Sequence, residues 1–450
     1  MIPGAKEHED TQYHTKQSAR KGIKRALCSN LGSNACLFLY DPALIKEFFL
    51  NNDNYIKDPL FLELFAPILG KGLLTSEGSQ WKAQRKALSC AFHFDFIKSI
   101  LPSIQATAHK NLYNLRKISL NKVHAMDELQ KITGEVVGKV FFGEELNEYE
   151  FDGRPLTLAL ADLTLMIAKA SEEPLRFILG GWFVTSGILP RHRKLMQKIK
   201  QFREICHQIV QNRKKLYSEQ KGSSSISKKD LLQTLIEYSG SEGKMDDEEI
   251  VDQFVALFLA GMDTTGHLLT MVVYYLYKYP EYKNRMTEEI QMYYKPNGVV
   301  TQESLNKLEF TMAFLKETLR IATPVIGVFP RKALKDHYLG DLHIRKGDIV
   351  LLDYMYNHYN PTYFDNVDDF KPERWLDKAK IIDSYAFTPF SAGARNCIGQ
   401  HLALNEAKII LGELLTMYDF KLQDGYQLKM ASPFLYEPLD PVLLDLTPKN

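Results

Sequence analysis

The sequence predicts a mainly α-helical protein with small β-sheets. Three observations support this fold class. Apolar residues at helical spacing dominate residues 81–321, a β-branched segment with glycine turns occupies residues 325–353, and a last apolar-periodic helix follows at residues 398–418. With 450 residues, of which 45% are apolar and 25% charged, the chain can enclose a large core. No linker divides it, so we expect a single domain over residues 1–450.

Shorter elements surround the long helices. Residues 36–40 are typical of a strand, and after Asp41-Pro42 a short helix is expected to end at Leu50. Residues 221–229 are rich in Ser and Lys, which predicts an exposed loop at about 218–229.

The β-branched segment contains two turn signals, Leu339-Gly340-Asp341 and Lys346-Gly347-Asp348, and both are expected to form hairpins. Residues 357–390 are rich in Pro, Asp and aromatic residues, and an irregular course is expected there.

Charge and cysteine usage exclude several classes of protein. The chain has 56 basic and 55 acidic residues, a net charge of +1, so no nucleic-acid-binding surface is indicated. The five cysteines are unclustered, which argues against a metal finger or a disulfide framework and for a reducing compartment. The first 35 residues are polar and contain no long apolar run or signal segment.

One cysteine stands in an unusual loop. Residues 390–399 read Phe-Ser-Ala-Gly-Ala-Arg-Asn-Cys-Ile-Gly and lead directly into a helix, whose free N–H groups and dipole stabilise a thiolate. Gly393 permits a backbone turn closed to other residues, and Gly399 removes a side chain where a flat group would lie. Arg395 can meet a carboxylate on that group. An isolated cysteine is most often a small buried apolar residue, but this loop is suited to presenting the Cys397 sulfur to a large planar ligand.

A second signal lies inside the most apolar helix. Residues 248–279 are apolar on almost all faces, so this helix must cross the core, and Asp246 is its expected N-cap. Its middle reads Ala-Gly-Met-Asp-Thr-Thr-Gly over residues 260–266. Two glycines there cost about 1 kcal/mol each relative to alanine. Asp and Thr also compete for helix hydrogen bonds. This local penalty indicates a functional deformation, although a kinked structural helix is the alternative.

Two charged or polar pairs are weak signals by themselves. Glu317 and Arg320 are spaced i, i+3 on one helix, and Trp81 and Arg85 are spaced i, i+4 on another. An indole N–H and a guanidinium are both donors to a carboxylate. An ordinary amphipathic helix explains either pair when it is considered alone.

Taken together, these motifs resemble those of the cytochrome P450 superfamily. Residues 390–399 fill every position of its haem-binding signature, and residues 260–265 resemble its oxygen-activating motif. Glu317 and Arg320, with Arg374 downstream, resemble the buried charge network of its Glu-x-x-Arg helix and meander. The motifs occur in the family's order and span nearly the whole chain.

The resemblance implies the family's fold, with haem b between the long central helix and the helix after the cysteine loop. It implies that Cys397 is the thiolate ligand of the haem iron. It assigns Thr264 to hydrogen-bonding dioxygen and Asp263, with water, to proton delivery. Further cofactor-binding residues, expected at the haem propionates, are Trp81, Arg85, Arg331 and Arg395.

The implied function is a monooxygenase that inserts one atom of dioxygen into an apolar organic substrate. Electrons are expected from NADPH or NADH through a separate flavoprotein reductase or ferredoxin-type donor, for which Lys82 and Lys86 are candidate docking residues. Candidate pocket walls are residues 60–74, 163–189 (including Phe177, Trp182 and Phe183) and 325–328. Two alternatives are a haem-thiolate isomerase or dehydratase acting on peroxides and a non-catalytic haem-binding protein. The intact Asp263–Thr264 pair argues against both.

Localisation is expected to be intracellular. Most eukaryotic relatives carry an N-terminal membrane anchor, and none is visible in the first 35 residues. The protein is therefore expected in the cytoplasm or, if an anchor is missing from this sequence, on the surface of the endoplasmic reticulum, with a peripheral membrane contact.

Overall fold

The computed structural model describes residues 13–22, 25–31, 34–220, 230–242, 245–295, 297–377, 379, 382–431 and 435–449. Most of the loop expected at about 218–229 therefore lies outside the described residues. The helices are α1 (Tyr13–Arg20), α2 (Pro42–Leu50), α3 (Pro59–Leu69), α4 (Gly78–Ser89), α5 (Phe94–Asn114), α6 (Ala125–Val137), α7 (Leu156–Ser171), α8 (Arg176–Leu179), α9 (Trp182–Thr185), α10 (Pro190–Gln220), α11 (Leu231–Glu242), α12 (Asp247–Lys278), α13 (Pro280–Tyr293), α14 (Gln302–Asn306), α15 (Glu309–Ile321), α16 (Tyr354–His358) and α17 (Gln400–Met417).

The strands form one larger sheet and several small ones. The larger sheet has the order β1-β2-β10-β7-β3, in which only β2 and β10 pair in parallel, and a second sheet has the order β11-β14-β4. The strands are β1 (Ala26–Leu31), β2 (Asn34–Leu39), β3 (Tyr55–Lys57), β4 (Val123–His124), β5 (Glu150–Phe151), β6 (Arg154–Pro155), β7 (Arg331–Ala333), β8 (His337–Leu339), β9 (Leu342–Ile344), β10 (Ile349–Leu352), β11 (Tyr418–Leu422), β12 (Met430–Ala431), β13 (Glu437–Pro438) and β14 (Leu443–Pro448). The predicted class, mainly helical with small sheets, is confirmed.

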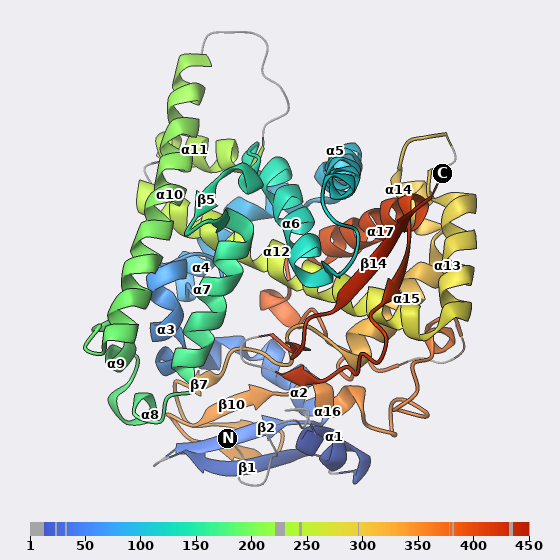
Figure 1. Cartoon of the computed structure of the whole chain (residues 1–450). Coiled ribbons are helices and arrows are strands. Elements are labelled where there is room, and N and C mark those ends of the chain that lie inside the picture. The colour runs from blue at the N-terminus through green and yellow to red at the C-terminus, as the bar shows by residue number, and fades with distance from the viewer. Residues whose placement is uncertain are drawn as a thin grey trace.

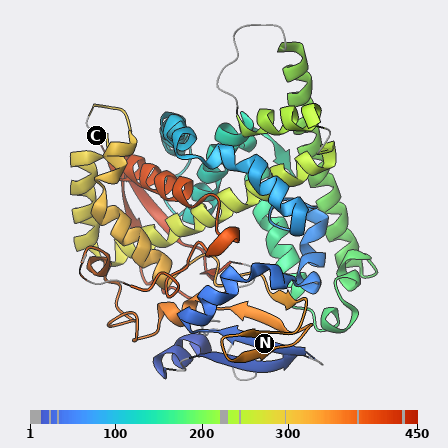
Figure 2. The ribbon, with the colours of Figure 1, turned by 180° about the vertical axis from the view of Figure 1, so that it is seen from behind.

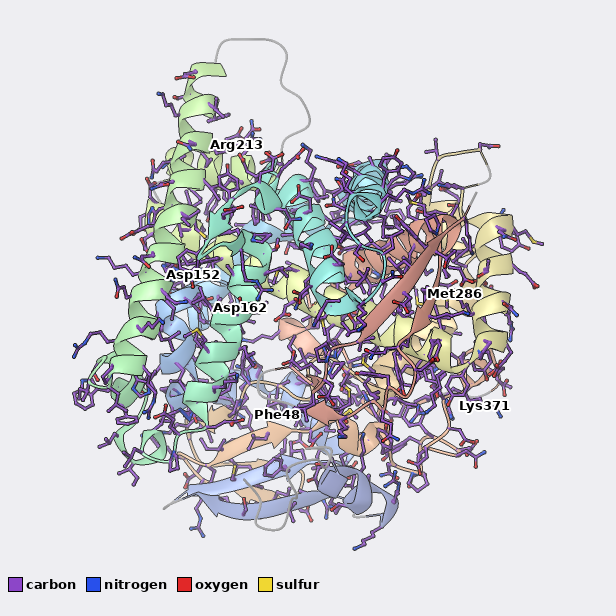
Figure 3. All side chains as sticks on the ribbon, viewed as in Figure 1. Phe48, Asp152, Asp162, Arg213, Met286 and Lys371 are labelled. Carbon is purple, nitrogen blue, oxygen red and sulfur yellow. The ribbon has the colours of Figure 1, made fainter. Side chains whose placement is uncertain are left out.

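The five-stranded sheet lies along one side of the molecule, and most of the helices are stacked above it (Figure 1). Two apolar clusters hold these parts together. Phe48 of α2 belongs to a cluster on the sheet, whereas Met286 of α13 belongs to the large core of the helical region; both are labelled in Figure 3. Helix α12 crosses the centre of the helical region, as its all-round apolar sequence predicts (Figure 1).

Helix α12 begins at a capping box. The Asp246 side chain accepts from the Glu249 backbone, and the Glu249 side chain accepts from the Asp246 backbone, so the predicted cap is confirmed. Among the described helices, α12 alone is long and apolar enough to span a bilayer, but 83% of its most apolar window is buried inside the protein. That burial is what a core helix shows. The helix is continuous over its full length, so the expected deformation at residues 260–266 does not interrupt it.

Most of the shorter elements are also as predicted. The strand at residues 36–40 is β2, the helix ending at Leu50 is α2, and residues 398–418 contain α17. Gly340, at φ +59°, closes the β8–β9 hairpin. The prediction for the second turn was only partly correct. Gly347, at φ +95°, does make a turn, but it joins β9 to β10, which belong to different sheets and do not pair.

Behind α12, as Figure 2 shows, α17 and α5 lie close together, and α17 also packs against α12 and α15. Glu317 of α15 is completely buried. Its Oε1 accepts from Arg320 Nη2 at 2.8 Å and from Arg374 Nε at 3.0 Å, and its Oε2 accepts from Trp375 Nε1 at 2.8 Å. Arg320 also donates to the carbonyl oxygens of residues 358, 367 and 369. The predicted Glu317–Arg320–Arg374 network is therefore present, and it ties α15 to the irregular segment before the cysteine loop.

Replacing Glu317 by alanine is expected to lower the free energy of unfolding by roughly 3–5 kcal/mol, because it leaves two buried guanidinium groups without their carboxylate. Urea unfolding measures this loss, and the purified Glu317→Ala protein is expected to retain no haem. Lys98→Ala is a suitable control, since it removes an exposed ion pair to Glu303 (3.1 Å). Exposed pairs contribute about 0–1 kcal/mol. Equal losses in the two variants, or normal haem content in Glu317→Ala, would contradict the structural role of the network.

Candidate active site

The cysteine loop places the Cys397 sulfur immediately before α17. Ser391 and Gly393 both have positive φ, +61° and +69°, and Phe49 lies 3.1 Å from the position that a Cβ on Gly393 would take. The Cys397 N–H donates to the Phe390 carbonyl at 2.9 Å, which closes the loop. A Cβ on Gly399 would sit 3.9 Å from the sulfur. Glycine at this position therefore leaves the space beside the sulfur open.

The Cys397 side chain is accessible to solvent and at the same time surrounded by many protein atoms. A side chain in a concave hollow has both properties. Solvent reaches it from one side, while the protein atoms around it reduce the solvation of a charged thiolate. Burial raises the pKa of the thiol, whereas the N–H groups of Gly399 and Gln400 and the charge of Arg85 lower it. Burial prevails, so the helix N-terminus alone does not make a thiolate here. A coordinated metal ion would do so, because a coordinating thiol is deprotonated.

Several cations meet at one carboxylate beside this loop. Glu77 lies 2.6 Å from Arg395 Nη2, 3.5 Å from Arg331 Nη1 and 3.3 Å from Lys57 Nζ. Lys57 and Arg331 are buried, with 4% and 7% of their surface exposed. Burial and the charges of Arg395 and Arg331 lower the pKa of Lys57 to about 7, although Glu77 opposes this. When all four groups are ionised, three positive charges face one negative charge, and the cluster carries a net charge of +2.

Trp81 and Arg85 of α4 lie next to this cluster but make different contacts. The Arg395 guanidinium lies over the Trp81 ring at 4.2 Å from its centroid. Arg85 donates to the backbone oxygen of Asn396 at 2.9 Å and to its side-chain oxygen at 3.0 Å. Arg395 and Trp81 therefore lie on the cation cluster, whereas Arg85 supports the cysteine loop itself.

These residues fit haem b, which carries two propionate carboxylates on a planar ring. Two carboxylates would neutralise the surplus charge of the Lys57–Glu77–Arg331–Arg395 cluster. The Nε of Arg395 is buried and has no hydrogen-bond partner among the described residues, so a donor is available. An accessible sulfur, an open space at Gly399 and a surplus of positive charge are the features that such a ligand requires.

Helix α12 contributes an uncovered stretch in the middle of its length. Residues 250–259 are all buried, but Ala260 is exposed and Gly261 and Thr264 are partly exposed, on neighbouring turns of one face. Thr264 Oγ1 donates to the Ala260 carbonyl at 2.7 Å. An uncovered face in the middle of a core helix indicates an internal hollow, and α17, which follows the cysteine loop, packs against this same helix.

Asp263 faces the other way, towards α6. Its Oδ1 accepts from Gln130 Nε2 at 2.6 Å, and both side chains are buried. Burial raises the pKa of Asp263 to about 6, and the Gln130 hydrogen bond lowers it. A carboxyl group with a pKa near neutrality can both give and take a proton at physiological pH.

Two surface hollows are not part of this arrangement. One, of about 360 Å³, lies between α3, α10 and α12, and another, of about 340 Å³, lies between α4, α11 and α12. Neither is lined by any predicted site residue. Among the described residues, no group of three or more His, Cys, Asp or Glu side chains is arranged to hold a metal ion.

Three residues of the site were not predicted from the sequence. Lys57 lies two residues after the buried Tyr55 in β3, and this period-two alternation was the available signal that it points inward. Gln130 precedes Gly134 by one helical turn, which places both on the face of α6 that meets α12. Glu77 precedes a helix, and nothing in its local sequence indicates three cationic partners.

Comparison with known proteins identifies the family. The family model "Cytochrome P450" matches residues 6–442. "Probable cytochrome P450 4d20" of Drosophila melanogaster is 27% identical over 424 residues, which cover 90% of this chain and 82% of the relative. "Cytokinin hydroxylase" of Arabidopsis thaliana is 28% identical over 402 residues, covering 88% and 75%, and "Leukotriene-B4 omega-hydroxylase 3" of Mus musculus is 29% identical over 382 residues, covering 82% and 71%.

The fold has a similar solved counterpart. A "Crystal structure of cytochrome P450DA heme domain" superposes with a TM-score of 0.81 at 22% sequence identity, and it covers 97% of this chain and 92% of that one. The family model covers almost the whole chain, and several relatives are named as hydroxylases. This protein therefore belongs to the cytochrome P450 family and is a haem-thiolate monooxygenase that carries haem b.

Proposed function

We propose that the haem of this monooxygenase lies in the hollow between α12 and the cysteine loop, with the Cys397 thiolate as the iron ligand. The observation that carries this proposal is that Lys57, Arg331 and Arg395 all meet the single carboxylate of Glu77, with Arg395 two residues before the accessible sulfur of Cys397. We also infer that residues 1–450 act as one domain, since the larger of the two apolar clusters includes residues from Ala19 to Leu446.

The haem supplies the centre at which dioxygen is reduced, and the chain's own residues hold the haem and supply protons. Arg331, Arg395 and Lys57 neutralise its carboxylates, and Trp81 supports Arg395. Arg85 fixes Asn396 and thereby the cysteine loop. Arg331, Arg395 and Lys57 would hold the cofactor directly, whereas Trp81 and Arg85 would act through Arg395 and the cysteine loop.

Proton delivery falls to two neighbouring residues of α12. The hydroxyl of Thr264 lies on the uncovered face of the helix. Its single hydrogen is donated to the Ala260 carbonyl, so it can accept from water as it stands and can donate to dioxygen once it releases that bond. Asp263 is the only carboxyl group within the 260–266 segment, and its raised pKa suits proton transfer near neutrality. We assign Thr264 to hydrogen-bonding and Asp263 to supplying protons.

The substrate is proposed to be an apolar organic molecule that is hydroxylated. Phe61 stacks on Phe65 and contacts Phe329, with ring centroids 5.2 and 5.0 Å apart, so the first expected pocket segment meets the residue that directly follows the third. The Trp182 side chain, by contrast, is 59% exposed and is better suited to a surface contact than to a pocket wall. Phe177 lies outside the side chains that the structure describes.

Cys397→Ser tests the iron ligand directly. The reduced-minus-carbonyl difference spectrum of the purified, haem-loaded protein is expected to show a strongly red-shifted Soret band, which reports an axial thiolate, and the variant is expected to lose it. Cys90→Ser is a matched control, because Cys90 is also accessible but lies outside the loop, on the α4 side. A red-shifted band that survives in Cys397→Ser would contradict this ligand assignment.

We further propose that the electron donor docks on α4. Arg85 links this helix to the cysteine loop, and Lys82 and Lys86 on the same helix are exposed. Lys82 has only a distant partner, Asp53 at 4.0 Å, and both of these side chains are largely exposed. Two exposed lysines close to the thiolate suit an acidic flavoprotein or ferredoxin-type surface.

Reversing both charges, as Lys82→Glu with Lys86→Glu, is expected to slow haem reduction by the donor about tenfold at low salt, because steering by opposite charges is lost. Stopped-flow reduction at several salt concentrations measures the effect. The control is the double variant Lys335→Glu with Lys346→Glu. Both lysines are exposed in the turns that flank the β8–β9 hairpin, away from α4, so the reduction rate should change little. Unchanged rate and salt dependence in the α4 variant would rule out docking at these lysines.

A membrane contact is proposed at the segment around α8 and α9. Exposed large apolar residues gather there: Leu175, Ile178, Leu179, Trp182 and Ile188, with exposed fractions between 46% and 79%. Exposed Arg191, Arg193 and Lys194 follow at the start of α10. Helices α8 and α9 lie at one edge of the molecule, as Figure 1 shows. Apolar side chains beside basic ones are typical of a segment that enters a membrane interface.

Ile178→Asp with Trp182→Asp is expected to weaken binding to vesicles of phosphatidylcholine and phosphatidylserine by tenfold or more, since each large apolar side chain contributes about 1.5–3 kcal/mol on burial. Co-sedimentation with the vesicles measures this. Leu216→Asp with Met292→Asp removes exposed apolar residues from other surfaces and serves as the control. If the two double variants bind equally well, the α8–α9 segment is not the contact.

A further inference from the structure

We infer that Gln130 of α6 is a positioning residue for Asp263, and that it sets the carboxyl group's orientation and proton affinity for the oxygen reaction. This inference rests on the proposed role of Asp263. Its basis is the 2.6 Å hydrogen bond from Gln130 Nε2 to Asp263 Oδ1 between two buried side chains that lie 133 positions apart in the chain.

The helix packing makes this contact a fixed one. A Cβ on Gly266 would lie 2.8 Å from Gln130 Cγ and 3.1 Å from its Cα, closer than side chains tolerate. Gly261 has the same relation to Val137, at 2.6 Å. Because α12 has no side chain at these two positions, the α6 backbone comes close enough for Gln130 to reach Asp263 while remaining buried.

A second bond holds the same pair of helices. Thr133 Oγ1 donates to the Met262 carbonyl at 2.7 Å, one residue before Asp263. Thr133 is fully buried, like Gln130, and both lie on the face of α6 that meets α12. The Thr133 bond involves no ionisable group. It therefore provides a matched comparison in which the helices lose a buried hydrogen bond but Asp263 keeps its donor.

The charges around Asp263 determine the direction of the effect. Glu437 of β13 is the ionisable group that acts on Asp263 from another element; burial and the charge of Asp263 raise the pKa of Glu437 to about 7, and Lys169 of α7 lowers it. On α12 itself, burial lowers the pKa of His267 to about 3, so this imidazole is neutral. Neither group donates to the Asp263 carboxylate, so Gln130 is its stabilising donor.

Loss of the Gln130 hydrogen bond is expected to raise the pKa of Asp263. A donor to a carboxylate favours the ionised form, so removing it raises the carboxyl pKa. Without Gln130, Asp263 is expected to stay protonated to a higher pH than in the wild type, where its pKa is about 6. A group that releases its proton less readily is a poorer donor in a rate-limiting transfer.

The test uses the full-length, haem-loaded protein and two readouts. Infrared absorption of the protonated carboxyl C=O, identified as the band absent from Asp263→Asn, is titrated through the pH range around 6. The solvent isotope effect on NADPH oxidation is measured with a flavoprotein reductase as the donor. The variants are Gln130→Met, which keeps the shape but loses the donor, Gln130→Glu, which keeps shape and polarity, and Thr133→Val.

Gln130→Met is expected to raise the Asp263 titration midpoint by roughly one unit, and Gln130→Glu by more, since it adds a second acidic group. Both are expected to enlarge the solvent isotope effect, whereas Thr133→Val leaves midpoint and isotope effect unchanged. An unshifted midpoint in both Gln130 variants, or an equal shift in Thr133→Val, would overturn the inference. If Asp263→Asn itself leaves NADPH oxidation and its isotope effect unchanged, the proposed role of Asp263 fails, whatever the titration shows.

Discussion

The burial of α12 is the constraint on which the rest of this structure depends. A helix of 32 residues that is apolar on nearly every side can exist in water only if other elements cover nearly every side. Helices α3, α6, α7, α10, α13, α15 and α17 all contact it. The face around Ala260, Gly261 and Thr264 remains uncovered. The proposed haem site is therefore the part of α12 that the other elements leave exposed.

Two of the buried charge clusters differ in how fully their hydrogen-bonding groups are satisfied. Around Glu317, two guanidinium groups, an indole N–H and several carbonyl oxygens complete one another's hydrogen bonds, and the network needs nothing further. Around Glu77, three cations share one carboxylate. Leaving surplus charge buried is costly. The first cluster thus joins α15 to the segment before the cysteine loop, and we propose that an anionic ligand completes the second, where Arg395 Nε has no partner among the described residues.

Local signals in the sequence were sufficient for the fold class and for most elements, because caps, turns and helical periodicity depend on near neighbours. The Asp246 cap and the Gly340 turn are examples. The second turn, at Gly347, was misassigned as a hairpin because strand pairing is not a local property: β10 pairs with β2, more than 300 residues earlier in the chain. The resemblance to a known family supplied the site residues that belong to motifs. It did not supply Lys57, Glu77 or Gln130, whose partners come together only through tertiary packing.

The close contact of α6 with α12 has a consequence for tolerance to mutation. Gly134, Gly261 and Gly266 carry no functional group, yet each faces the neighbouring helix at a distance that excludes even a methyl group. A Cβ on Gly134 would lie 2.4 Å from Thr157 and 3.2 Å from Met262. An alanine at Gly261 or Gly266 would push α6 and α12 apart and draw Gln130 away from Asp263, whereas an alanine at Gly134 would first clash with Thr157 of α7. These three glycines are therefore expected to tolerate substitution as poorly as a residue with a reactive side chain.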